Sequence, residues 1–93
     1  MYTVILEAQL RIGGCDSLKE KRHIVKHTIT QLRKLFLASV SETGQQDKLD
    51  RLQLGVAVAC SDMPGAQSML QSITDWVYEN EQFINADVVG EII

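Results

Sequence analysis

Apolar and polar side chains alternate along several stretches of the chain, and this alternation predicts its strands. Over residues 2–12 every even position is apolar and the odd positions are mostly polar. A period of two over eleven residues is typical of a strand with one buried face. The same pattern recurs, with less regularity in the second and fourth cases, and predicts four strands, at residues 2–12, 36–42, 51–60 and 83–93. In the fourth strand, Ile84 is expected on the same face as Ala86 and Val88.

The intervening stretches have helical spacing. Ser17 and Glu20 form the pattern of a capping box, which predicts a helix from Leu18 to about Leu35. Its expected core stripe consists of Leu18, Val25, Thr28, Ile29, Leu32 and Phe36. Asp62 is a good N-cap and Pro64 suits a first helical turn, so a second helix is expected to run to about Asn80.

The predicted order β-α-β-β-α-β defines an α+β fold. With right-handed crossovers it gives a ferredoxin-like sandwich, in which a four-stranded antiparallel sheet carries two helices on one face. We expect strand order 4-1-3-2, which places the start of the first helix and the polar loop at residues 43–50 at the same end of the sheet. A chain of 93 residues is expected to form a single domain, residues 1–93.

Composition and cysteine usage indicate the class of protein. Hydrophobic residues make up 45% and charged residues 23% of the chain, as in ordinary globular proteins. No apolar run is long enough for a membrane helix, and the first strand begins too early to leave room for a signal peptide, so a cytoplasmic location is expected. Cys15 and Cys60 have neither metal-ligand nor redox spacing, and the topology puts them at opposite ends, so both are expected to be reduced thiols.

Charge is divided unevenly along the chain. All nine Lys and Arg lie in residues 1–51 with six of the twelve acids, and residues 52–93 hold the other six acids. The net charge of −3 argues against a generic nucleic-acid binder. The asymmetry itself indicates either a charged partner or complementarity between the two helices.

The basic residues of the first helix form the main candidate site. Lys19, Arg22, Lys26 and Arg33 make a narrow stripe beside the core face. Lys21 falls inside the apolar arc. Either its stem packs while its ammonium reaches solvent at the helix end, or it is aimed at an anion or carboxylate near the helix N-terminus.

Residue chemistry gives no support for catalysis. The chain lacks a phosphate-binding glycine loop, a nucleophile elbow and an obvious Cys–His pair, so we expect no enzymatic activity and no cofactor. His23 and His27 lack a third ligand, and no metal is expected. The outward positions of the central strands carry no aromatic residue on which bases would stack. Ile5, Val89 and Ile93 instead make the open sheet face a candidate surface for self-association as a dimer.

Several motifs together resemble the YlxP-like family of small uncharacterised bacterial proteins. They are Arg11-Ile12-Gly13-Gly14, Ser17-Leu18-Lys19-Glu20-Lys21-Arg22, Gln46-Asp47, Leu54-Gly55-Val56-Ala57-Val58 and Ser61-Asp62. The resemblance implies a ferredoxin-like fold and no established activity. Genes of the family often lie beside those for a translation initiation factor and a ribosome-maturation factor, which implies an accessory role linked to the ribosome or structured RNA.

Three functional hypotheses follow. In the first, the basic helix contacts RNA phosphates, and the contact residues are Lys19, Lys21, Arg22, Lys26 and Arg33, with Gln46 and Asp47 shaping the adjoining end. In the second, the chain is a structural or protein-interaction module that self-associates through its sheet and pairs these cations with an acidic protein surface. A third is an anion sensor built on Gly13, Gly14 and the helix N-terminus.

Overall fold

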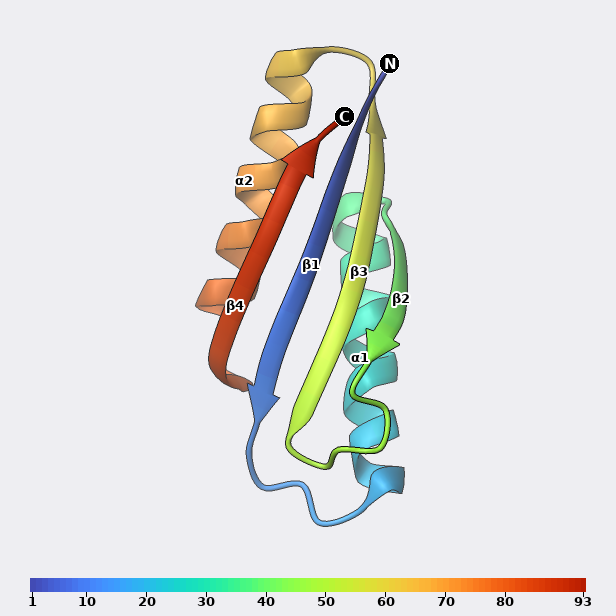
Figure 1. Ribbon diagram of the computed structural model, residues 1–93, viewed down its shortest axis with the longest axis vertical. Helices are drawn as coiled ribbons and strands as arrows, with labels where there is room; N and C mark the ends of the chain where they lie inside the picture. Colours follow the sequence, from blue (N-terminus) through green and yellow to red (C-terminus); the bar gives the residue numbers. More distant parts are fainter.

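The computed structural model describes residues 1–93. The elements are β1 (Tyr2–Ile12), α1 (Leu18–Phe36), β2 (Ser39–Gly44), β3 (Arg51–Cys60), α2 (Met63–Glu79) and β4 (Phe83–Ile92). The four strands form one antiparallel sheet in the order β2-β3-β1-β4. Both helices lie behind the sheet and leave its other face open (Figure 1). The predicted ferredoxin-like α+β arrangement is therefore confirmed.

The core lies between the sheet and the helices. β1 and β3 pair with Val4 opposite Val58 and Leu10 opposite Leu52, so that the alternating apolar residues of both strands fall on the helix side. From that side the helices contribute Val25, Leu32, Ile73 and Val77, all buried. The rings of Phe36 and Trp76 meet edge to face, 6.5 Å between centroids, and join the two helices. The long central strands make the molecule elongated, at 43 × 19 × 19 Å.

Both helices begin where the sequence predicts. The Ser17 hydroxyl accepts a hydrogen bond from the Glu20 N–H at 3.1 Å, and Asp62 accepts one from the Gly65 N–H at 2.7 Å. The Glu20 carboxylate accepts from the N–H of Asp16, at 3.0 Å, one residue earlier than a standard capping box would place it. These bonds satisfy N–H groups that have no partner inside the helix.

The end of α1 differs from the prediction. Phe36 belongs to the helix, and β2 begins only at Ser39. The helix ends at Phe36, and Leu37 caps it: Leu37 adopts the left-handed conformation at φ 52° and donates its N–H to the Arg33 carbonyl. Leu18, expected in the core stripe, is 37% exposed because the loop after β2 covers the first helical turn only in part.

The start of β4 also differs. The pairing of β4 with β1 shifts between Arg11 and Ile12, where Phe83 pairs with Ile12 and Asn85 with Arg11. Ile84 is the extra residue of this bulge, and bulges redirect side chains. Phe83 therefore takes the buried place, and Ile84, which was predicted on the core face, is 70% exposed. A Cβ added to Gly13 would lie only 2.7 Å from the Cδ1 atom of Ile84, so a larger residue at position 13 would displace the Ile84 side chain.

The termini of the strands separate the two cysteines. Cys60 pairs with Tyr2 at one end of the sheet, whereas Cys15 follows the other end of β1, and both thiols are free. Neither helix combines the length and the apolar character that crossing a membrane requires.

Candidate functional site

Lys21 is the most buried charged residue, with 2% of its surface exposed. Its ammonium donates a hydrogen bond to the backbone carbonyl of Gln45 and lies 3.8 Å from Oε2 of Glu42. The interpretation in which the ammonium reaches solvent is therefore wrong, because the group is held inside the protein. The alternative of a carboxylate partner is met by Glu42, at the end of β2.

The buried Lys21 fixes the polar loop that follows β2. Gln45 adopts a left-handed backbone conformation at φ 61°, and its carbonyl also accepts the N–H of Lys48 at 3.1 Å. A non-glycine residue in this conformation costs free energy, which a charge-assisted hydrogen bond offsets. Oε2 of Glu42 is buried and accepts no hydrogen bond, so the Lys21 charge is what compensates its burial. Lys21, Glu42 and Gln45 therefore act as one unit, which we call the Lys21 clamp.

The exposed side of α1 carries cations that have no internal partner. Lys19, Arg22 and Lys26 are all exposed and lie on one side of the helix. The only ion pairs within 4.0 Å are Lys21–Glu42 and Arg11–Asp50. No ion pair within 4.0 Å links α1 to the acidic α2. The three cations, called the α1 stripe below, span about 10 Å at the helical rise of roughly 1.5 Å per residue.

Arg33 continues the line of the α1 stripe but has a structural partner. Its guanidinium donates to the Val40 carbonyl at 3.0 Å. Val40 belongs to β2, an edge strand whose outward carbonyls have no partner in the sheet. Arg33 thus ties α1 to this edge, and part of its hydrogen-bonding capacity is already used.

A groove between α1 and the β2 edge collects most of the predicted contact residues. One hollow of about 280 Å³ is lined by Arg22, Lys26, Arg33 and Glu42, among others. An adjoining hollow of about 380 Å³ is lined by Lys21, Arg22, Glu42, Gln46 and Asp47, among others. The structure therefore brings six of the seven predicted residues together. Lys19 lies on the outer flank of the helix, near Ser17 and His23.

Two members of this site escaped sequence analysis. Glu42 has the alternation of a strand residue, and nothing in its neighbourhood along the chain marks a buried lysine as its partner. Gln45 contributes its backbone carbonyl, which carries no signal in side-chain patterns. The only available sign was Lys21 itself, a cation inside an apolar arc. Of the two glycines before α1, Gly14 has a positive φ, 69°.

The arrangement is suited to binding anions. Its exposed cations are guanidinium and ammonium donors, which bind phosphate or carboxylate oxygens, and Asp47 is the one exposed carboxylate among the lining residues. No group of three or more His, Cys, Asp or Glu side chains gathers anywhere in the chain to hold a metal ion. His23 and His27 are exposed on α1.

Comparisons with known proteins show where the chain belongs. The sequence profile of DUF503, described as a protein of unknown function, matches residues 3–89. The uncharacterized protein YlxP of Bacillus subtilis (strain 168) is 32% identical over 71 residues, which cover 76% of this chain and 77% of that protein. Among solved structures, the de novo designed protein Ferredog-Diesel aligns with 96% of this chain and 83% of its own, at 14% identity and a TM-score of 0.46. The chain is thus a member of the DUF503 family of proteins of unknown function, to which the resemblance to YlxP-like proteins points.

Proposed function

We propose that the protein is a non-catalytic accessory protein that binds RNA, in the setting of the ribosome, through the α1 stripe. The observation that carries the proposal is that Lys19, Arg22 and Lys26 are exposed along one side of a helix with no carboxylate within 4.0 Å. Exposed cations without internal partners release the counterions of a polyanion when they bind it, which favours association.

The charge distribution supports binding of a polyanion on one side of the molecule. α1 contains six Lys and Arg and one acid, Glu20, a local charge of +5 within a chain of net charge −3. α2 has no Lys or Arg and lies over the other half of the sheet (Figure 1). A phosphate backbone is attracted to α1 and repelled from α2, so one side of the molecule is favoured for docking.

The choice of RNA rests on the family resemblance. Genes of YlxP-like proteins often lie beside those of a translation initiation factor and a ribosome-maturation factor. The open face of the sheet lacks the aromatic residues on which single-stranded bases stack, so the proposal assigns contact to the phosphate backbone of folded RNA. Sequence-independent contacts of this kind suit a ribosomal surface.

Co-sedimentation with ribosomal subunits across a salt series tests the proposal. We expect binding that weakens steeply with salt, and that is lost in the Arg22→Glu, Lys26→Glu variant. Binding that is insensitive to salt, or equal in the variant, contradicts the role of the stripe. Absence of binding at every salt concentration contradicts the ribosomal setting.

A second candidate function, self-association through the open face of the sheet, is supported by a separate observation. Ile5, Val89 and Ile93 on the open face are 38%, 69% and 64% exposed, which favours a protein-interaction module that self-associates through the sheet. Sedimentation equilibrium tests it, with a dimer expected for the native chain and a monomer for Val89→Lys. A monomer at all concentrations up to the millimolar range eliminates this candidate.

A further inference from the structure

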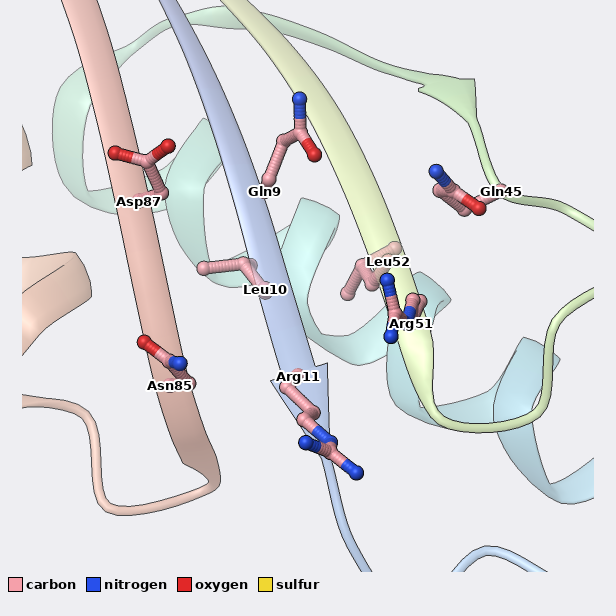
Figure 2. A pocket seen from close by; sticks show the side chains of 8 residues that line it. All are labelled: Gln9, Leu10, Arg11, Gln45, Arg51, Leu52, Asn85 and Asp87. Atoms are coloured by element: carbon pink, nitrogen blue, oxygen red, sulfur yellow. The ribbon is translucent and has the colours of Figure 1, made fainter.

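Another polar hollow lies on the open face of the sheet, on the side opposite the helices. Its volume is about 210 Å³, and the side chains around it are Gln9, Arg11, Gln45, Arg51, Asn85 and Asp87. Figure 2 shows them rising from β1, β3 and β4, with Gln45 contributed by the loop after β2. Three strands and one loop thus supply polar groups to one place.

Two arginines stand directly opposite each other at this hollow. Arg11 of β1 pairs with Arg51 of β3. The Ile12 N–H donates to the Asp50 carbonyl at 2.9 Å, so the next pair, Arg11–Arg51, is of the non-hydrogen-bonded kind, in which side chains come closest. Like charges in this position are destabilising.

Little within the chain offsets that repulsion. Arg11 lies 3.8 Å from Asp50, but both side chains are more than half exposed, at 57% and 51%, and such pairs contribute little. Arg51 has no carboxylate within 4.0 Å. An external anion placed between the two guanidinium groups would remove the conflict, since each offers several donors in a fork that fits phosphate oxygens.

The rest of the rim offers three side-chain amides and one carboxylate, that of Asp87. The register places Asp87 beside Gln9 and Asn85 beside Arg11. The side-chain amides of Gln9, Gln45 and Asn85 make no hydrogen bond within the chain, and Asp87 has no ion-pair partner. The Lys21 clamp holds the backbone of Gln45 from behind, which makes Lys21 a positioning residue for this rim.

We propose that this hollow is a nucleotide site that holds a 5′-phosphate and its ribose. The phosphate lies between Arg11 and Arg51, the ribose hydroxyls donate to Asp87, and the amides of Gln9 and Asn85 bind oxygens of the sugar or the base edge. A volume of 210 Å³ is below the roughly 300 Å³ at which pockets for whole small ligands begin, so the base extends over the sheet. Because the site lies on the opposite face from the α1 stripe, an experiment can refute this proposal without refuting the function proposed above, and the reverse.

Titration followed by NMR tests the site with four probes. They are adenosine 5′-monophosphate, adenosine, and tetra-adenylate with and without a 5′-phosphate. We expect the two phosphorylated probes to shift the side-chain amide resonances of Gln9, Gln45 and Asn85, and the two unphosphorylated probes to leave them unchanged. If the phosphorylated tetra-adenylate binds at least about tenfold tighter than the mononucleotide, the source of the ligand is an RNA end, and equal affinity identifies a free nucleotide.

Charge-matched variants test this site. Arg51→Gln removes a charged donor and weakens binding of the mononucleotide by at least about tenfold. Lys34→Gln, which removes one charge at an exposed residue outside both sites, leaves that affinity unchanged. We expect Arg51→Gln to stay folded, because the substitution removes the like-charge repulsion with Arg11. Should it fail to fold, Asn85→Ser, which loses one amide, is expected to weaken binding about threefold. Equal affinity for adenosine and its monophosphate, or affinity unchanged in both site variants, overturns the proposal.

Discussion

Replacing Lys21 by methionine is the sharpest test of the Lys21 clamp, because methionine keeps the length of the stem and removes only the ammonium. Two losses follow. The charge-assisted hydrogen bond to the Gln45 carbonyl contributes about 1.5 to 3 kcal/mol. Attraction to Glu42 across 3.8 Å corresponds to about 4 kcal/mol at an effective dielectric constant of roughly 20.

Other terms offset part of these losses. Burial of the ammonium costs several kcal/mol, and the variant no longer bears that cost. Glu42 keeps 23% of its side chain exposed, so water screens its charge in part. We expect a net loss of about 2 to 3 kcal/mol in the free energy of unfolding, which lowers the melting temperature by about 10 to 20 °C for a domain of this size.

Urea unfolding followed by circular dichroism measures the effect, with Lys21→Met, Glu42→Leu as the matched control. The double variant removes the buried carboxylate together with its cation, so most of the stability is expected to return. A residual loss of about 1 kcal/mol remains, because the Gln45 carbonyl keeps only the Lys48 N–H as a donor. The reasoning is refuted if Lys21→Met unfolds within about 0.5 kcal/mol of the native chain, or if the double variant is no more stable than the single one.

Two further predictions concern the ends of α1. Leu37→Gly is expected to raise the free energy of unfolding by up to about 1 kcal/mol in urea titrations, because Leu37 is 88% exposed and holds a left-handed conformation that glycine adopts without strain. A loss of stability would contradict this, because it would show that the Leu37 side chain makes a stabilising contact. Ser17→Ala removes the acceptor for the Glu20 N–H and is expected to cost about 1 kcal/mol of stability, measured as a lower melting temperature, whereas Ser17→Asp preserves the cap. Equal stability of the native chain and Ser17→Ala would contradict the capping argument.

Local patterns predict most of the fold because the burial of each element depends on residues close to it in sequence. The alternation in residues 2–12 and 51–60 identifies the central strands, and Ser17 and Asp62 identify both helix starts. The boundary at Phe36 was wrong because Phe36 satisfies both periods at once: it alternates with Ala38 and Val40, and it also follows Leu32 by one helical turn. The turn that ends the helix contains Leu37 at φ 52°, and the sequence has no glycine there that would predict a turn.

The candidate site was predicted in part. Its exposed cations are visible from helical spacing, which is local. The hydrogen-bond partner of Lys21 is the carbonyl of Gln45, 24 residues away along the chain. The bulge at Ile84 depends on how β4 pairs with Arg11 and Ile12 of β1. Such contacts are set by the register of distant strands, which a single sequence does not specify. The cross-strand pair of Arg11 and Arg51 likewise appears only once β1 and β3 are aligned.

The central claim is that the α1 stripe binds RNA phosphate, and the salt dependence of binding tests it most directly. Fluorescence anisotropy on a structured ribosomal RNA fragment compares the native chain with Arg22→Gln, Lys26→Gln and with a control, Gln67→Glu, Ser68→Glu, which makes the same change of net charge on exposed positions of α2.

We expect the slope of log affinity against log salt to be about −2 to −3 for the native chain and the control, and to become shallower by about 1 to 2 in the stripe variant. Equal slopes for the stripe variant and the control would contradict the account, because binding would then depend on net charge alone.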